Sequence, residues 1–272
     1  MNGTLRKMIT RLGDTVEYDL PVGDARLPLN PLIGQNIKLS HTGRIFCIAC
    51  GRKTTKSFSQ GHCYPCMTSL AACDMCILKP ETCHFHAGTC REPAWGEEHC
   101  MIPHIVYLAN TSSLKVGITR QSQVPTRWMD QGASQALPIF RVKTRRISGF
   151  VEVALAQSMA DKTNWRAMLK GDGEAIDIKA KAAVAAPAIA DRLDAIRGEH
   201  GDDAIEPLDE DVVAITYPVT EYPTKITSLN FDKHPLVEGR LTGIKGQYLI
   251  LDTGVINIRK FAGYEIDLEY GS

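Results

Sequence analysis

The sequence predicts an α+β protein in which a small antiparallel sheet flanked by helices lies between a cysteine-rich segment and a β-rich C-terminal part. Three observations support this fold class. Short stretches that alternate apolar and polar residues, as half-buried strands do, occur near both ends of the chain. All nine cysteines fall between positions 47 and 100. Two apolar runs on either side of a turn at residues 109–113 predict a β-hairpin in the middle of the chain.

Changes in composition along the 272 residues suggest five successive segments. The last of them has the short strands and the Asp-Thr-Gly turn of a small barrel or sheet, which the N-terminal strands could complete. The helical segment before it should be interrupted at Pro187. The five are residues 1–46 (β-rich lead-in), 47–100 (cysteine-rich), 101–170 (sheet and helices), 171–213 (helices and acidic linker) and 214–272 (small β domain).

Charge is unevenly distributed, although the whole chain is neutral. Residues 101–170 hold ten Lys and Arg against three Asp and Glu, whereas residues 171–272 hold ten against nineteen. The basic middle predicts an anionic partner, with nucleic acid, and DNA in particular, as the leading candidate. Alternatively, the acidic C-terminal region complements the basic middle, or it binds a protein partner.

The sequence contains no apolar run close to the roughly 18 residues of a membrane span. The first twenty residues also lack the apolar core of a signal peptide. We therefore expect a cytoplasmic protein that has no membrane partner.

Four cysteines form two Cys-x2-Cys pairs, Cys47 with Cys50 and Cys63 with Cys66, separated by twelve residues. Each pair offers two thiolates on a tight turn, and the intervening loop lets the pairs converge on one tetrahedral zinc ion. A reducing cytosol and the odd number of cysteines argue against disulfides. Because protein would fill all four positions, this zinc would be structural.

The remaining cysteines predict a second zinc site whose ligands the spacing leaves open. A single zinc, with the other thiols packed in a small core, is one alternative, and an iron–sulfur cluster is a less favoured one. A segment with so few aliphatic residues would gain much of its folding free energy from metal. The preferred ligands are Cys73, Cys76, Cys83 and Cys90, and either of the last two could be replaced by His86 or Cys100.

After the hairpin, the middle segment should form a helix from Pro125, a strand over residues 139–147 and a second helix capped by Ser148. The first helix contains Arg127, the second contains Glu152, and Asn164 follows the second. Basic residues on the strand would bind neighbouring phosphates without reading sequence. These residues are Arg141, Lys143, Arg145 and Arg146.

This order of elements resembles the GIY-YIG nuclease superfamily over about residues 104–170. Ile105-Val106-Tyr107 stands where the first signature tripeptide would be, and Lys115-Val116-Gly117 where the second would be. Ile105 takes the place of the expected glycine, and Lys115 that of the second signature tyrosine. The resemblance implies a three-stranded antiparallel sheet flanked by helices. The whole chain also resembles a bacterial family that carries a cysteine-rich zinc-binding segment.

The resemblance implies a zinc-stabilised nuclease that hydrolyses DNA phosphodiester bonds. Glu152 would hold a catalytic Mg²⁺ or Mn²⁺, since magnesium keeps much of its hydration shell and needs few protein ligands. Arg127 would pair with phosphate oxygens, and Lys115 would donate to the phosphate. Tyr107 would orient the attacking water or act as a general base, and Asn164 would hold the geometry by hydrogen bonding.

Two other functions are compatible with the same residues. Lys115 in the second tripeptide also suits a domain that binds nucleic acid, or acts as an adaptor, without cleaving. A zinc-scaffolded protein-interaction module with no nucleic-acid partner is the third reading. Taken singly, a tyrosine in a strand is more often part of a core, and a glutamate on a helix more often faces solvent. The nuclease hypothesis therefore depends on all of these residues occurring together in the order that the superfamily shows.

Overall fold

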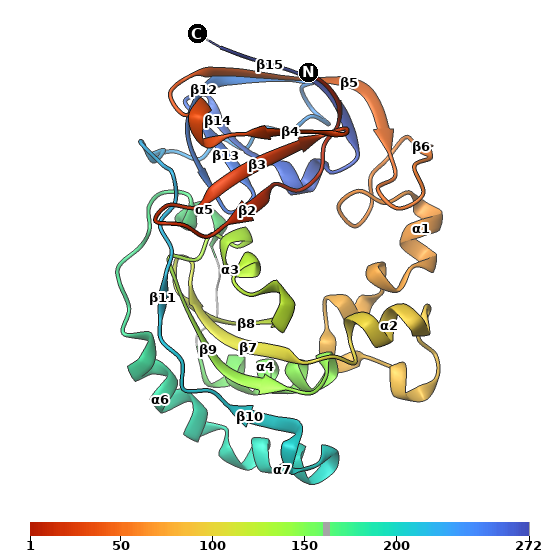
Figure 1. Cartoon of the computed structure of the whole chain (residues 1–272), viewed down its shortest axis with the longest axis vertical. Helices are drawn as coiled ribbons and strands as arrows, with labels where there is room; N and C mark the ends of the chain where they lie inside the picture. Colours follow the sequence, from red (N-terminus) through yellow and green to blue (C-terminus); the bar gives the residue numbers. More distant parts are fainter. Residues whose placement is uncertain (160–163, 272) are drawn as a thin grey trace.

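The computed structural model describes residues 1–159 and 164–271. It has a mixed α+β architecture with three antiparallel sheets, which confirms the predicted fold class (Figure 1). Within the described residues, none of the three sheets closes into a barrel. Nor does any helix in this part of the chain have the length and apolar character needed to cross a bilayer.

The largest sheet is built from both ends of the chain. Its strand order is β1-β15-β5-β12-β13-β14, with β6 paired to β5, so the N-terminal strands β1 and β5 lie on either side of the C-terminal strand β15 (Figure 1). Residues 1–46 and 214–272 therefore share one sheet. Its strands are β1 (Asn2–Thr4), β5 (Asn36–Phe46), β6 (Lys53–Thr54), β12 (Leu236–Lys245), β13 (Tyr248–Leu251), β14 (Gly254–Asn257) and β15 (Tyr264–Gly271). A separate three-stranded sheet, β2 (Ile9–Arg11), β3 (Glu17–Val22) and β4 (Ala25–Pro28), packs on the same core.

The middle sheet contains the predicted hairpin. Its order is β10-β9-β7-β8, with β11 also paired to β9, so β7 is internal and β8 is an edge strand. All seven residues of β7 are buried, because both faces of the sheet are covered. The strands are β7 (His104–Asn110), β8 (Leu114–Arg120), β9 (Gln135–Val142), β10 (Ile205–Pro207) and β11 (Val213–Ala214).

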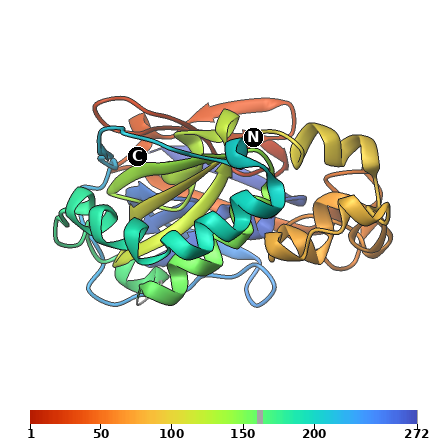
Figure 2. The ribbon, with the colours of Figure 1, turned by 90° about the horizontal axis from the view of Figure 1, so that it is seen from below.

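The two faces of β7 belong to different cores. Val106 and Leu108 pack with α4 (Arg145–Ser158), α6 (Ile178–Ala188) and α7 (Ala190–His200), and Figure 2 shows α6 and α7 crossing the outer side of the sheet. Ile105, Tyr107 and Ala109 instead join the core formed with α3 (Thr126–Asp130) and the two other sheets. The two-residue period of a strand therefore turns Tyr107 toward α3.

The predicted strand over residues 139–147 is wrong at its C-terminal end. β9 ends at Val142, and α4 begins at Arg145. Thr144 is the N-cap, and its side chain accepts a hydrogen bond from the backbone N–H of Ile147. Arg145 and Arg146 consequently lie in the first turn of a helix, not on the face of a strand. The predicted interruption occurs, but two residues later than Pro187, which lies inside α6: that helix ends at Ala188 and α7 begins at Ala190.

The cysteine-rich segment runs along one side of the molecule from β5 to β7 and consists of short helices and turns (Figure 1). Its element η4 (Pro80–Thr82) packs directly on α4, where a Cβ at Gly149 would lie 2.4 Å from the backbone nitrogen of Glu81. The segment contains α1 (Tyr64–Ser69), η2 (Ala71–Cys73), η3 (Met75–Ile77), η4, η5 (Phe85–Ala87) and α2 (Pro93–His99). The remaining short helices are η1 (Asn30–Leu32), η6 (Gln121–Gln123), α5 (Trp165–Met168), η7 (Asp202–Ala204) and η8 (Ile258–Phe261).

Candidate functional site

The four thiols of the two Cys-x2-Cys pairs converge, as predicted. The Sγ atoms of Cys47, Cys50, Cys63 and Cys66 all lie within 4.8 Å of one another, and those of Cys50 and Cys63 are 3.7 Å apart. Four sulfurs that each lie about 2.3 Å from a tetrahedral zinc are about 3.8 Å apart. The donor set therefore fits one structural zinc ion.

Backbone geometry around the first pair favours a thiolate. Burial alone would oppose ionisation of Cys47, but backbone N–H groups of Cys50, Cys63 and Ala49 donate toward its sulfur, and the pKa of the thiol falls to about 6. Gly51 makes this turn possible at φ +72°, a left-handed conformation that favours glycine. A low thiol pKa suits a metal ligand, which must be deprotonated.

The Tyr107 side chain lies inside the molecule, above the edge strand of the middle sheet. It is fully buried, and its ring makes an edge-to-face contact with Trp128 at 5.8 Å between centroids. Strand pairing places Tyr107 opposite Gly117, where a Cβ would lie 2.6 Å from the phenol oxygen. Glycine at position 117 is therefore what allows the ring to lie across β8.

Gln131 connects Tyr107 to Arg127. The phenol oxygen and the Gln131 amide are 2.8 Å apart. With the amide nitrogen donating to Tyr107, the amide oxygen accepts from Nη2 and Nε of Arg127 at 3.1 and 3.2 Å. Burial raises the pKa of Tyr107 to about 12, although Arg127 opposes the shift. The phenol thus stays protonated at neutral pH, which favours a hydrogen-bonding role over that of a general base.

A second arginine, which the sequence-based prediction does not include, lies within electrostatic reach of Arg127. Arg259 lies in η8, and its Nε donates to Oε1 of Gln60 at 2.7 Å. Burial lowers the pKa of Arg259, the positive charge of Arg127 lowers it further, and the negative charge of Asp130 partly opposes the shift. Asp130, the neighbouring acid, pairs with Lys7 at 3.0 Å. Among the described residues, neither guanidinium forms an ion pair with a carboxylate.

The other predicted catalytic residues differ in how close they lie to Tyr107. Glu152, half-buried on α4, is near enough for its charge to raise the pKa values of Tyr107 and Arg145. Lys115 is half-buried on β8, on the same face as Gly117. Asn164 is exposed and caps α5, accepting from the N–H groups of Arg166 and Ala167 at 3.0 and 3.3 Å. Tyr107 therefore interacts with Arg127 through Gln131 and with Glu152 only at electrostatic range, since α4 packs on the other face of the sheet, and Asn164 makes a helix-capping contact.

Comparison with known families covers most of these features with a single family model. Residues 34–266 match the family model described as "Protein of unknown function (DUF2797)". The chain belongs to the DUF2797 family. The matched DUF2797 region includes the four-cysteine cluster, Tyr107, Arg127 and Arg259. Comparisons with curated proteins and with solved structures gave no match.

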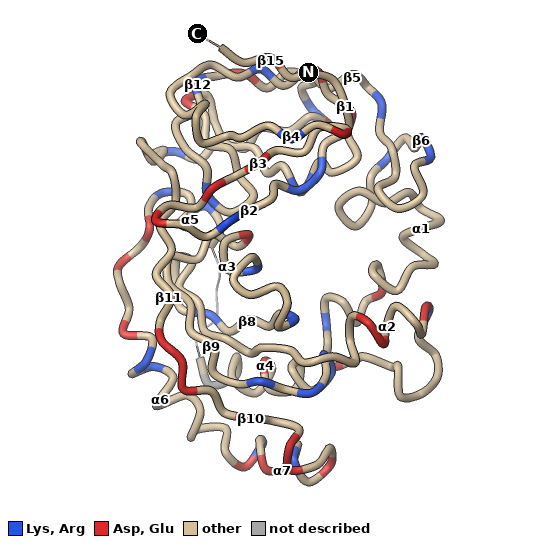
Figure 3. The backbone as a smooth tube through the Cα atoms, in the orientation of Figure 1, with Lys and Arg blue, Asp and Glu red and all other residues tan. Residues whose placement is uncertain are grey.

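Two of the four predicted phosphate-binding residues of this DUF2797 protein already form ion pairs with carboxylates. Arg141 pairs with Glu206 at 3.5 Å, and Lys143 pairs with Asp203. Figure 3 shows the acidic residues that follow α7 close to this basic strand. The acidic linker thus complements the basic middle, which is the alternative that the charge distribution raised.

The other two members of that set lie at the start of α4. Arg145 turns into the cysteine-rich segment, where its Nη2 donates to the carbonyl oxygen of Ile77 at 2.7 Å. Arg146 lies over the ring of Phe150, 5.0 Å from its centroid. The prediction that Arg145 and Arg146 lie on the face of a strand is therefore wrong.

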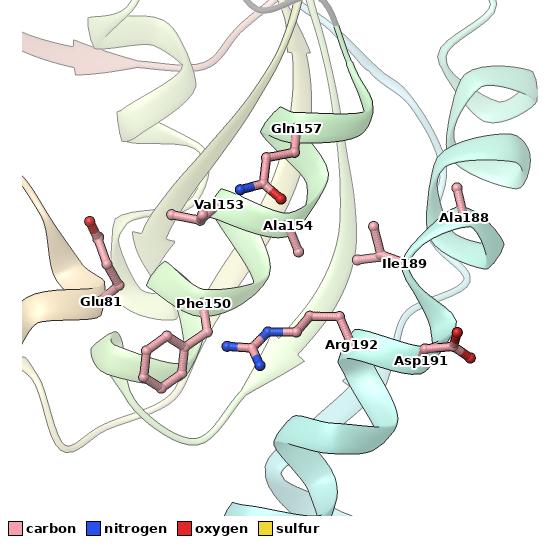
Figure 4. A pocket seen from close by; sticks show the side chains of 9 residues that line it. All are labelled: Glu81, Phe150, Val153, Ala154, Gln157, Ala188, Ile189, Asp191 and Arg192. Atoms are coloured by element: carbon pink, nitrogen blue, oxygen red, sulfur yellow. The ribbon is translucent and has the colours of Figure 1, made fainter.

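A surface groove of about 740 Å³ lies between η4, α4 and the junction of α6 and α7 in the DUF2797 region (Figure 4). The guanidinium of Arg192 points at the Phe150 ring, 5.8 Å from its centroid. None of the predicted site residues lines this groove. It is therefore separate from the neighbourhood of Tyr107.

The second cysteine cluster differs from the preferred ligand set. Cys76, Cys83, Cys90 and Cys100 line one small cavity together. Cys73 is not part of that lining, and its thiol interacts with the side chain of Ser59. Cys100, which the sequence offered only as a substitute for Cys83 or Cys90, lines this cavity, whereas Cys73 does not.

Proposed function

We propose that the protein binds nucleic acid through a phosphate site formed by Arg127 and Arg259, on a GIY-YIG-like middle domain. One observation carries the proposal: two arginines from distant parts of the chain lie within electrostatic reach of each other, and among the described residues neither forms an ion pair with a carboxylate. Bringing like charges together in a partly buried site costs free energy, and a bound anion removes that cost. A phosphate suits the site because each arginine can pair with two of its oxygens.

The surroundings of the two arginines support a preformed site. Gln131 holds Arg127 and is itself held by the buried Tyr107, while Gln60 holds Arg259. Side chains that are already oriented lose little conformational entropy on binding. The central order β9-β7-β8, with helices on both faces, is the arrangement that the GIY-YIG resemblance implies.

Paired substitutions distinguish this site from a general effect of basic charge. We expect Arg127→Gln with Arg259→Gln to weaken binding of duplex DNA by at least about tenfold in a fluorescence-anisotropy titration. The matched control, Arg141→Gln with Lys143→Gln, removes the same formal charge from residues that already pair with acids. It should bind nearly as well as the wild type. Equal weakening by both pairs would contradict the proposed site.

Metal-dependent cleavage of DNA is a second candidate, which the position of Glu152 favours. Its carboxylate lies within electrostatic reach of Tyr107 and Arg145. A magnesium or manganese ion held there would polarise a phosphoryl oxygen. Arg127 would neutralise developing charge on the phosphate, and the protonated Tyr107 would serve as a hydrogen-bonding group.

Glu152→Gln tests the cleavage candidate, because it removes the charge and keeps the side-chain shape. We expect wild-type protein with Mg²⁺ or Mn²⁺ to nick supercoiled plasmid, and the variant to lose nicking while retaining DNA binding. Glu81→Gln, a groove residue outside this neighbourhood, is the control and should still nick. If the wild type binds but never nicks, the cleavage candidate is rejected and the binding function stands.

A further inference from the structure

We propose that Cys76, Cys83, Cys90 and Cys100 hold a second metal centre. The four thiols come from separate short elements, η3, the turns after η4 and before α2, and the end of α2, yet they line one small cavity. Cys83 and Cys100 are buried, the other two are half-buried, and none is in a disulfide. The Cys76 thiol interacts electrostatically with those of Cys83 and Cys100, and the Cys100 thiol with those of Cys83 and Cys90.

The segment around this cavity lacks another source of folding free energy. No residue between positions 46 and 104, all of which are described, belongs to any of the three hydrophobic clusters. The first zinc would fix residues 47–66 only. Residues 71–100 must therefore be held by something other than an apolar core, and metal ligation is the usual solution in small cysteine-rich segments.

Two neighbouring residues fit a thiolate-ligated centre. Gly96 on α2 leaves room for a ligand, because a Cβ there would lie 3.2 Å from the Cys90 Sγ and 2.9 Å from the Phe85 ring. Arg145 lies beside Cys76 and Cys100, and its backbone N–H donates to the Cys100 carbonyl at 2.8 Å. Four thiolates around a divalent ion leave roughly two negative charges, which this buried cation partly offsets.

A competing set of ligands at the same place is less suitable. Asp74, Cys76 and His84 have ligand atoms within 4.8 Å of one another, a spacing at which the four thiols do not form a group. However, Asp74 already forms an ion pair with Nε of Arg91 at 2.7 Å and lies 3.5 Å from His84. A metal at that group would have to displace Arg91, whereas Arg145, the cation beside the four thiols, is held by its hydrogen bonds to the carbonyls of Ile77 and Cys100.

The centre would be thiophilic, because all four donors are sulfur. Both a zinc ion and an iron–sulfur cluster take four thiolates. Either would fix η4 against α4, the helix that carries Glu152. Metal at this place would thus stabilise the contact between the cysteine-rich segment and the middle domain.

Metal counting on the full chain tests the proposal. In native mass spectrometry and elemental analysis, the wild type should carry two centres: two zinc ions, or one zinc ion together with iron and acid-labile sulfide and visible absorption. Either result supports the proposal and identifies the metal. A wild type with one zinc ion and no iron would overturn it, and this measurement needs no variant.

Two single substitutions then assign the ligands. Cys100→Ser should lose one centre and keep the first zinc, whereas Cys73→Ser, the matched control from the same segment, should keep both. The reverse pattern would overturn the assignment in favour of the set that includes Cys73. Because the wild-type count is measured separately, misfolding of one variant leaves the proposal testable.

Discussion

Replacement of Cys63 by serine will release the first zinc ion and unfold residues 47–70, including the short edge strand β6, while the other six strands of the largest sheet remain intact. This loop has no part in the hydrophobic clusters, so metal ligation supplies its stability. Structural zinc contributes about 10–16 kcal/mol of apparent binding free energy in zinc-finger peptides. Zinc content and hydrogen exchange measured by mass spectrometry will show the loss.

The same substitution should weaken DNA binding, because Gln60 lies in the loop between the two cysteine pairs and holds Arg259. Cys73→Ser is again the control and should retain zinc, exchange protection and binding. Unchanged protection of residues 47–70 in the Cys63 variant would show that the loop is stable without metal. That result would remove the proposed link between zinc and Arg259.

Gly117→Ala will destabilise the protein by about 1–3 kcal/mol and displace the Tyr107 ring. The added Cβ would lie 2.6 Å from both the Cζ atom and the phenol oxygen of Tyr107, which is fully buried. Displacement of the ring would also break its contact with Gln131 and loosen Arg127. Chemical denaturation followed by circular dichroism will measure the change in the free energy of unfolding.

Two comparisons separate this clash from a general effect of alanine. Gly198 lies on α7, and no atom is within 4 Å of the Cβ that Gly198→Ala would add. This substitution should not lower the free energy of unfolding, because alanine favours a helix more than glycine does. In a Tyr107→Ala background, the loss of unfolding free energy caused by Gly117→Ala should largely disappear, because the clashing ring is absent. An undiminished loss in that background would contradict the contact between position 117 and the Tyr107 ring.

Features that depend on local spacing could be predicted from the sequence. The two Cys-x2-Cys pairs converge because each pair needs only a tight turn and a twelve-residue loop. The hairpin around residues 109–113 follows from two apolar runs and a turn. Strand β9 was misjudged because alternation continues by chance past Val142, and the capping side chain of Thr144 starts a helix there.

Features that depend on distant contacts could not be predicted. Arg259 reaches the site because the C-terminal strands pair with the N-terminal ones, as in the register of Asn2 with Asp267. No local pattern marks Arg259 or its partner Gln60. The same holds for Cys100, whose place in the second cluster depends on how α2 folds back over η3 and η4.

The salt dependence of duplex DNA binding tests the central claim, the phosphate site at Arg127 and Arg259, most directly. Each neutralised phosphate contributes about 0.9 to the slope of the logarithm of the binding constant against that of salt concentration. We predict that Arg127→Gln with Arg259→Gln reduces this slope by about 2, and that Arg141→Gln with Lys143→Gln leaves it unchanged. An unchanged slope in the first pair, or a reduction confined to the second, would contradict the site.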